Sequence, residues 1–290
     1  MLEDLPDFDA LWDYHNPENT EQLFLEILPV AQNDGDDDYL AQLLTQVART
    51  QGLQRKFDVA HQTLNDAEAL LSDETPVAHI RYFLERGRVY NSAQKVDSAY
   101  PLFKHAWDGA REQAEDYYAV DAAHMLGICE TGDESLRWNE LAMDVAEASD
   151  HPRAKGWLGA LYNNTGWTYH DLGNYERALE LFQKGLAWRQ ARQDTIATQI
   201  AKWTVARTLR SMGRVEDALE KQRLLHNENK AIDRPDPYVS EEMGECLLAL
   251  DQADEAQPHF ACAYEALSQD AWLKDKEPER IERLKQLSLG

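Results

Sequence analysis

The chain has 290 residues, and its 29 Lys and Arg stand against 53 Asp and Glu, which gives a formal net charge of −24 at pH 7. So large a negative charge argues against broad attraction to nucleic-acid phosphates or to anionic lipid head groups. No run of eighteen apolar residues occurs, and the first residues lack the basic region and apolar stretch of a signal peptide. The three cysteines are widely separated among apolar neighbours, as buried, reduced thiols are. We therefore expect a cytoplasmic protein that binds neither nucleic acid nor membrane.

The first predicted element is a helix from Pro17 to about Gln32, opened by Asn16 as the N-cap and by proline at the first helical position. The apolar residues that precede it are expected to cover the first end of the fold, and they are Phe8, Leu11 and Trp12. Residues 1–36 are thus predicted to form an N-terminal cap.

Residues 37–270 are predicted to form six pairs of helices. The pairs are 37–53 with 57–71, 76–93 with 96–114, 115–131 with 133–149, 152–172 with 175–191, 194–212 with 215–231, and 235–250 with 253–270. A charged helix from Pro278 to near Leu287 follows, so residues 271–290 are predicted to form a C-terminal cap. No linker rich in Pro, Gly or Ser divides the chain, which favours a single domain over residues 1–290.

The repeating pattern is clearest in residues 161–188, which read LYNNTGWTYHDLGNYERALELFQKGLAW. Gly166 in the first helix and Ala178 in the second are small, and two antiparallel helices need such residues where they approach closely. Tyr169 and Phe182 are large enough to fill the space between one pair and the next. The segment resembles the tetratricopeptide repeat through Gly166, Tyr169, Gly173, Tyr175, Ala178 and Phe182.

Five more copies keep this register, at spacings of 38 to 40 residues. The small residue of the first helix recurs as Ala48, Gly87, Gly127, Gly166, Ala206 and Gly244. The small residue of the second helix recurs as Ala60, Ala99, Asn139, Ala178, Ala218 and Ala256, and the large residue after it as Leu64, Phe103, Met143, Phe182, Gln222 and Phe260. The resemblance implies an all-α fold, a right-handed α-solenoid or superhelix of about six helix pairs with capping helices at both ends. Asn139 and Gln222 match poorly, which predicts irregular packing in the third and fifth units.

No constellation of residues predicts chemistry. The nine histidines include no pair four residues apart on one helix, and none joins a cysteine pair at zinc-ligand spacing. Phosphate-binding glycine loops, dinucleotide fingerprints and nucleophile elbows are missing from the sequence. We therefore predict no catalytic residues, no metal, no cofactor and no enzymatic activity.

Binding is the favoured function, and the helical wheel predicts where it occurs. The residue after each small first-helix residue points into the concave groove, and neighbours on the same stripe extend this surface. The candidate groove residues are Arg49, Arg81, Arg88, His124, Asn163, Asn164, Trp167, His170, Trp203, Arg207 and Arg210. Two alternatives remain open: the arginines form an ordinary solvated face, and Trp203 belongs to the core between repeats.

The class of ligand follows from two kinds of residue. Asn163 and Asn164 resemble the asparagines with which tetratricopeptide proteins, kinesin light chain among them, hold a peptide backbone, which implies an extended peptide as the ligand. Arginines suit a partner with an acidic segment or a C-terminal carboxylate. The sequence thus predicts a protein-interaction module, an adaptor or scaffold that binds a partner protein or peptide in its groove. The alternative is a ligand- or peptide-sensing regulatory domain that acts through a separate output partner.

Overall fold

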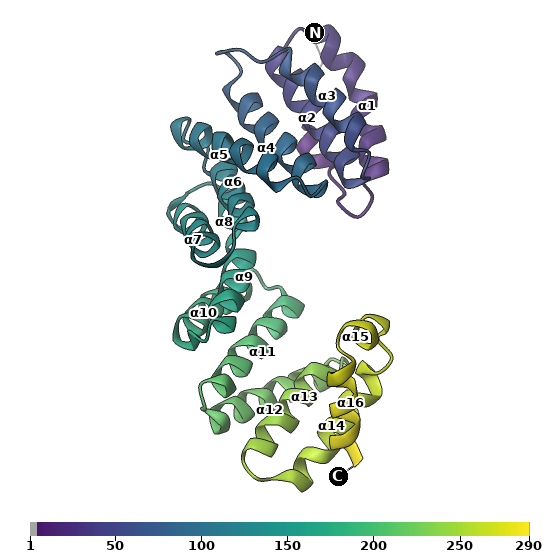
Figure 1. Cartoon of the computed structure of the whole chain (residues 1–290), viewed down its shortest axis with the longest axis vertical. Coiled ribbons are helices and arrows are strands. Elements are labelled where there is room, and N and C mark those ends of the chain that lie inside the picture. The colour runs from purple at the N-terminus through teal and green to yellow at the C-terminus, as the bar shows by residue number, and fades with distance from the viewer. Residues whose placement is uncertain (1–4, 290) are drawn as a thin grey trace. The chain divides into compact units, whose positions relative to one another are not determined.

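The computed structural model describes residues 5–289, and every regular element within that range is a helix, with no strand (Figure 1). The predicted all-α fold of consecutive helix pairs is confirmed. Residues 1–4 and 290, which belong to the predicted caps, lie outside the described residues. The chain forms two compact units, Met1–Leu158 and Gly159–Gly290, each of which is described by itself. A single domain over residues 1–290 stays a prediction.

The first unit contains a short 3-10 helix and eight α-helices. They are η1 (Phe8–Leu11), α1 (Pro17–Asp34), α2 (Asp37–Leu53), α3 (Phe57–Glu68), α4 (Pro76–Ser92), α5 (Val96–Glu112), α6 (Asp116–Cys129), α7 (Gly132–Ala148) and α8 (Pro152–Gly156). Consecutive helices pack as antiparallel hairpins, α2 on α3, α4 on α5 and α6 on α7. The predicted boundaries of these three pairs agree with the structure to within three residues.

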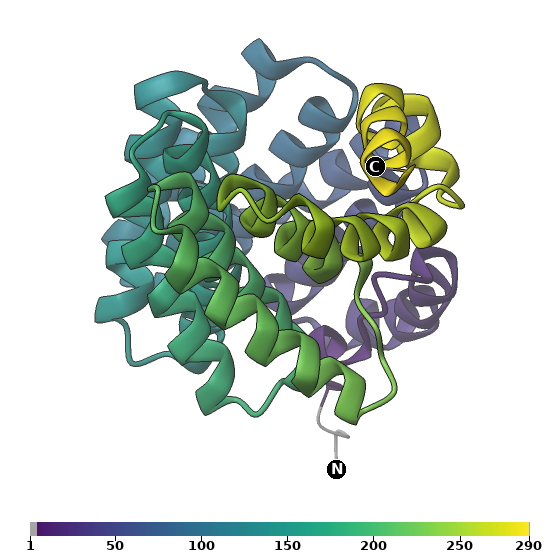
Figure 2. The same ribbon diagram turned by 90° about the horizontal axis from the view of Figure 1, so that it is seen from below.

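The second unit continues the pattern. Its helices are α9 (Leu158–Asp171), α10 (Tyr175–Ala191), α11 (Thr195–Ser211), α12 (Val215–Ala231), α13 (Pro237–Ala249), α14 (Ala253–Leu267), α15 (Ala271–Lys276) and α16 (Pro278–Leu289). The predicted C-terminal helix is α16, which packs against α14, and the yellow C-terminal helices lie together in both views (Figures 1 and 2). Leu284 of α16 is fully buried in the core of this unit.

One predicted helix is broken. Residues 152–172 form α8 and then α9, separated at Trp157, whose N–H donates to the Ala154 carbonyl at 3.1 Å in a tighter turn than an α-helix has. Gly156 and Gly159 flank the break, and a Cβ added at Gly159 would lie 2.6 Å from the Trp188 ring. Glycine weakens a helix, and here it allows the Trp188 indole to approach the backbone.

The turns after most of the first helices share one conformation, and the turn after α6 is the exception. Two residues past the last helical residue, φ is positive at Gly173 (78°), and also at Gln94 (61°) and Arg55 (63°). The next N–H then reaches back into the helix, as the Asn174 N–H does to the Tyr169 carbonyl at 2.9 Å. Glycine adopts this conformation without strain, so only the glycine turns are recognisable in the sequence.

In three hairpins, a phenylalanine faces the glycine of the first helix that lies sixteen positions before it. A Cβ added at Gly87 would lie 2.6 Å from the Phe103 ring, and one at Gly166 would lie 2.6 Å from Phe182. Gly244 faces Phe260 in the same way. The two copies with alanine in place of glycine pair it with a smaller or narrower side chain, Ala48 with Leu64 and Ala206 with Gln222. In these hairpins, the size of the second-helix residue is thus matched to the size of the first-helix residue.

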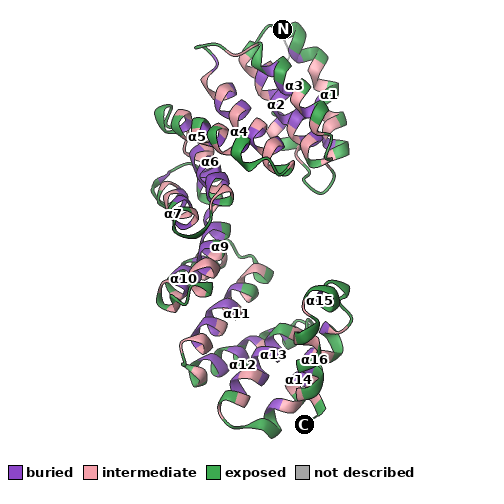
Figure 3. Cartoon of the chain, in the orientation of Figure 1, coloured by how far each residue is buried: buried purple, intermediate pink, exposed green. Residues whose placement is uncertain are grey.

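The two poorly matching residues keep their places in the register but pack differently. The Asn139 amide fills the space beside Gly127, where an added Cβ would lie 2.8 Å from its nitrogen. Gln222 is fully buried, and neither of its amide atoms has a hydrogen-bond partner within the described chain. Most buried residues of the hairpins are apolar, and they follow the inner faces of the helices (Figure 3).

Candidate functional site

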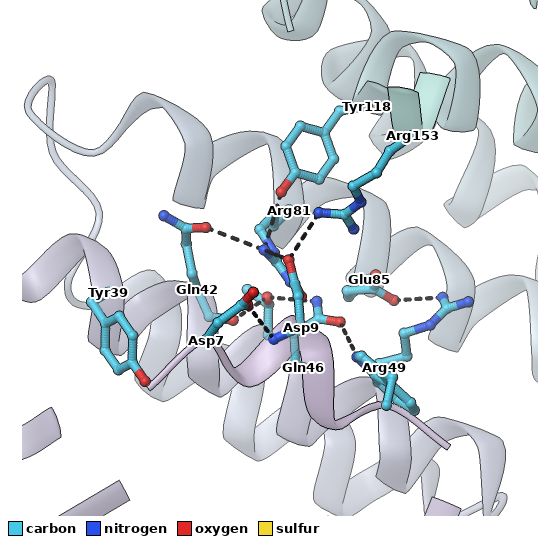
Figure 4. A network of polar contacts seen from close by, with 12 residues as sticks. Asp7, Asp9, Tyr39, Gln42, Gln46, Arg49, Arg81, Glu85, Tyr118 and Arg153 are labelled. Atoms are coloured by element: carbon cyan, nitrogen blue, oxygen red, sulfur yellow. Dashed lines mark hydrogen bonds and ion pairs between the residues drawn. The ribbon is translucent and has the colours of Figure 1, made fainter. Parts of the chain in front are cut away.

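The first unit contains a cavity of about 520 Å³ on the side of the first helices of its hairpins. Residues from η1, α2, α4, α6 and α8 surround it, and Figure 4 shows its polar contacts. We call it the arginine cavity, and its lining residues are Asp9, Trp12, Tyr14, Gln46, Arg49, Arg81, Leu84, Glu85, Arg88, Tyr117, Tyr118, Asp121, Arg153 and Trp157.

Helical spacing places these side chains. Arg81, Glu85 and Arg88 are separated by four and three residues, so they share one face of α4. Gln46 and Arg49 have the same relation on α2. The sequence-predicted residues Arg49, Arg81 and Arg88 are therefore brought together, and all three line the cavity.

Arg81 is the most buried of the arginines, with 5% of its side chain exposed. Its Nη2 and Nη1 donate to the two carboxylate oxygens of Asp9 at 2.6 and 3.0 Å, so the pair is bidentate (Figure 4). Nη1 also donates to the Tyr118 hydroxyl at 3.0 Å. Burial alone would lower the pKa of Arg81, but Tyr118 and Asp9 outweigh it and raise that pKa. Arg81 is thus a fixed cation.

Asp9 is held from a second side by Arg153 of α8, whose Nη1 donates to Asp9 Oδ2 at 3.2 Å. Arg153 itself lies over the Tyr117 ring, 4.0 Å from its centroid. Burial alone would raise the pKa of Asp9, but the hydrogen bonds and charges of Arg81 and Arg153 outweigh it and leave that pKa below its ordinary value. The Asp9 carboxylate therefore links η1 to Arg81 on α4 and to Arg153 on α8, which follow Asp9 by 72 and 144 residues in the sequence.

The other arginines of the cavity pair with acidic residues of neighbouring helices. Glu85 accepts from Arg49 at 3.0 Å and from Arg88 at 2.7 Å, and Arg88 also bonds Asp121 of α6. Glu85 and Asp121 keep only 6% and 7% of their side chains exposed. Four arginines and three carboxylates thus line the cavity, which leaves one positive charge in surplus on a strongly acidic chain.

Aromatic rings complete the lining. Trp12 stacks on Tyr14 with ring centroids 4.6 Å apart, and the Arg49 guanidinium lies 5.6 Å from the Tyr14 ring centre. The predicted residue His124 contacts Trp157 with centroids 5.2 Å apart. Burial lowers the pKa of His124, so its imidazole is neutral at pH 7. Flat rings beside guanidinium groups favour peptides with aromatic and acidic side chains.

The lowered pKa of Asp9 predicts a pH dependence. A carboxyl group whose pKa is lower in the folded chain stabilises the fold fully above its unfolded pKa of about 3.9, and this contribution is lost as the pH falls through the folded value. We expect the parent to be more stable than an Asp9→Asn variant at about pH 6, and the difference to shrink toward about pH 3. Urea unfolding of both proteins across this range measures it, and a difference independent of pH would contradict the assignment.

The remaining candidate residues lie in the second unit. Glu242 of α13 accepts from Arg207 at 2.9 Å and from Arg210 at 2.8 Å, with 6% of its own side chain exposed. Glu241 and Glu245 of the same helix are paired as well, with Arg280 and Arg283 of α16. These four arginines therefore each have a carboxylate partner within the second unit.

Two tryptophans of the second unit pack rather than project freely. Trp167 contacts Phe182 edge to face at 5.1 Å and lies 6.0 Å from Trp203, and both pack against the core. The Trp203 indole N–H donates to the Tyr238 carbonyl at 3.2 Å. These contacts favour the alternative that assigned Trp203 to the core between repeats.

His170 and Ser211 meet at a distance that suggests a nucleophile and its base. His170 Nε2 lies 2.9 Å from Ser211 Oγ, and Asp171 lies 3.7 Å from the other ring nitrogen. That second distance exceeds a hydrogen bond, and Arg207 Nη1 donates to Ser211 Oγ at 2.7 Å, which withdraws electron density from the would-be nucleophile. The arrangement is typical of a structural polar contact.

Asn163 and Asn164 lie on α9. The Asn163 amide donates to Asn164 Oδ1 at 3.2 Å, and Asn164 is exposed. Each amide keeps further donors and acceptors that a peptide backbone can use. Both residues belong to the second unit, whereas the arginine cavity belongs to the first, so their joint role in one site stays a prediction.

The sequence did not identify Asp9, Arg153, Tyr117 or Tyr118 as site residues. Tyr117 lies four residues before Asp121, so extending the groove stripe of α6 by one turn would have included it. Arg153 precedes the break at Trp157, where the helical wheel of α9 no longer applies. Asp9 precedes the repeats altogether.

Comparison with known proteins places the repeat. The family model for the tetratricopeptide repeat matches residues 159–192, which comprise α9 and α10. Residues 159–192 are a tetratricopeptide repeat. This confirms the resemblance inferred from the clearest copy of the pattern. No curated protein matches the chain in sequence.

Solved structures with the same fold are also tetratricopeptide proteins. The nearly identical TPR-like repeats of a Podosopora anserina protein named as a kinesin light chain share 17% identity, cover 68% of this chain and 98% of theirs, and give a TM-score of 0.52. BtubC from P. vanneervenii gives 0.58 at 13% identity, over 80% of this chain and 95% of its own. A signal-transduction ATPase with a tetratricopeptide repeat sensor from Pyrococcus horikoshii gives 0.61 at 15%, over 93% of this chain and 44% of its own. At these identities the likeness concerns the fold alone.

Two searches of the described residues bear on other functions. None of their helices is long and apolar enough to cross a membrane. Among residues 5–289, no three His, Cys, Asp or Glu side chains gather in a way that could hold a metal ion.

Proposed function

We propose that the chain is a protein-interaction module, an adaptor that binds an extended acidic segment of a partner protein in the arginine cavity. The observation that carries this proposal is the bidentate pair of Arg81 with the Asp9 carboxylate, because it supports a cavity whose size and charge suit a carboxylate side chain. Tetratricopeptide folds are typical of proteins that bind other proteins, which supports the same function.

The electrostatics of the chain support a small, selective site. The net charge of −24 repels an acidic segment from most of the surface, whereas the cavity presents four arginines. This difference in electrostatic potential steers an acidic ligand toward the arginine cavity. The rings of Trp12, Tyr14 and Trp157 add apolar contact area beside the charges.

The test uses a display library of random twelve-residue peptides, selected against the purified full chain at low salt. We expect the recovered peptides to be enriched in Asp, Glu and aromatic residues, because these match the lining of the cavity. Recovered peptides without acidic residues, or none at all from repeated selections, would contradict the proposal.

A sensor function has one observation in its favour, which is the size of the cavity. A volume of about 520 Å³ lies within the range of small-molecule sites. Native mass spectrometry of the purified chain decides this point. A bound metabolite of defined mass, released by an Arg49→Ala substitution, would favour the sensor over the adaptor.

A further inference from the structure

The segment of residues 7–14, which we call the N-terminal segment, lies in the arginine cavity through side chains from both of its ends. Phe8 is buried against Phe24 and Tyr39, with ring centroids 6.2 and 5.1 Å away. The next residue, Asp9, accepts hydrogen bonds from Arg81 and Arg153 through its carboxylate. Three residues further, the Trp12 indole N–H donates to Gln46 Oε1 at 3.0 Å.

A simple cover over the end of the fold would need only the apolar contacts. Phe8 and Trp12 belong to the apolar cluster with Phe24 and Val47 at α1 and α2, which is where an end cap would lie. Asp9 instead reaches α4 and α8, beyond the first hairpin (Figure 4). Its carboxylate supplies a charge that a cap does not need, and it satisfies a deeply buried arginine.

The backbone contacts of the segment agree with an exchangeable occupant. Its regular structure is the single 3-10 turn η1, in which the Ala10 N–H donates to the Asp7 carbonyl at 3.2 Å. Near the start of α1, the Asp13 N–H donates to the Thr20 hydroxyl and the Asp13 carbonyl accepts from it, both at 3.2 Å. The contacts that reach the arginine cavity come from side chains, in the way that a bound peptide makes them.

From these contacts we propose that the arginine cavity recognises a partner segment in which an aromatic residue directly precedes a carboxylate and a second aromatic residue follows three positions later. The N-terminal segment, with Phe8, Asp9 and Trp12, holds this place in the free protein and is displaced by the partner. The proposal rests on the proposed function, since it names the ligand of the same cavity.

The test uses a fluorescent synthetic peptide of residues 5–16 as the probe and full-length chains as receptors. In the parent, the attached segment competes at a high effective concentration, so we expect weak binding of the probe. In an Asp9→Ala chain the attached segment loses its carboxylate, and we expect the probe to bind at least about tenfold more tightly, as anisotropy titration measures. An Asp13→Ala chain is the matched control, because it removes the same charge from the same segment and the Asp13 carboxylate contacts the His15 backbone N–H.

A replacement variant and a hydrogen-exchange measurement complete the test. If circular dichroism shows that the Asp9→Ala chain is unfolded, a Trp12→Ala chain replaces it, since Trp12 is only half-buried. Hydrogen exchange of residues 5–15 in the parent must rise when the probe is added to saturation, because the attached segment leaves the cavity. Unchanged exchange would overturn the displacement.

The peptides themselves separate the two proposals. A scrambled peptide of the same composition, and one with the Asp9→Asn change, should each bind the Asp9→Ala chain at least about tenfold more weakly than the probe. If the scrambled peptide binds as well as the probe, the aromatic and acidic pattern is wrong, but an acidic ligand remains supported. If the probe binds parent and Asp9→Ala chains equally, or neither, while the library yields acidic peptides, the N-terminal segment is only a cap and the proposed function stands. If the library also yields none, both proposals fail.

Discussion

Replacing Arg88 with alanine should lower the free energy of unfolding by about 3–5 kcal/mol, which is typical when one partner is removed from a buried ion pair. Arg88 keeps 15% of its side chain exposed, and it is bonded to Glu85 and Asp121, which are still more buried. Its loss leaves Glu85 paired with Arg49, but it removes the arginine that pairs with the buried Asp121 carboxylate. Urea unfolding followed by circular dichroism measures the change.

Arg137 provides the matched control. It pairs with Glu134 at 3.1 Å in the same unit, but 60% and 55% of the two side chains are exposed, so Arg137→Ala should cost at most about 1 kcal/mol. The double variant Arg88→Met with Asp121→Leu should recover most of the loss, because apolar groups of similar size replace a buried pair well. An Arg88→Ala variant as stable as Arg137→Ala would mean that the cavity is wetter than the structure indicates.

A Gly87→Ala substitution should destabilise the fold by about 1–3 kcal/mol, although alanine is ordinarily the better helix former by about 1 kcal/mol. The added Cβ would lie 2.6 Å from the ring of Phe103, which is fully buried and has no room to move. Gly109, in the interior of α5, is the control. A Cβ there meets Ile80 at an ordinary 3.4 Å, so Gly109→Ala should stabilise the chain by up to about 1 kcal/mol.

A second substitution, based on another hairpin of the chain, should offset the stability lost in Gly87→Ala. Ala48 and Leu64 occupy the same two positions of the first hairpin, so Gly87→Ala combined with Phe103→Leu recreates a pair that the fold already uses. The double variant should be more stable than the sum of the two single changes by about 1 kcal/mol or more. Additive losses in thermal melting would show that Gly87 and Phe103 are not in contact.

The helix pairs could be predicted because each depends on residues close together in the sequence. The columns that contain Gly166 and Phe182 repeat every 38 to 40 residues, and their burial follows from a pattern within one hairpin. The break at Trp157 was missed because Gly156 and Gly159 resemble the small residues that the pattern expects in a first helix. The Trp188 ring, which the next helix supplies, lies where a Cβ at Gly159 would be, and no pattern within the first helix predicts this contact.

The candidate site could be predicted only in part. The helical wheel placed Arg49, Arg81 and Arg88 together, and the structure agrees. The helical wheel did not predict which carboxylates pair with these arginines, because the partners Asp9 and Asp121 come from other helices. Asp9 lies 72 residues from Arg81, and no local pattern relates such positions.

Arg207 illustrates the same limit in the second unit. The sequence placed it on the groove stripe as a candidate binding residue, with a solvated face as the alternative, but it bonds the buried Glu242, which lies 35 positions further on. Charge reversal at Arg207 would therefore disturb the fold as well as any ligand, and its role in binding stays a prediction. Residues whose partners lie in the next repeat need the structure to be interpreted.

The central claim is that the arginine cavity binds an acidic segment, and the most direct test is the affinity of the library-selected peptides for Arg49→Ala and Arg137→Ala chains at two salt concentrations. Arg49 lines the cavity and bonds Glu85 rather than Asp9, whereas Arg137 lies outside the lining. We predict that Arg49→Ala weakens binding about tenfold at low salt and less at high salt, as expected for a lost charge-assisted hydrogen bond, while Arg137→Ala changes it less than about twofold. Equal affinities for the two variants would contradict the claim.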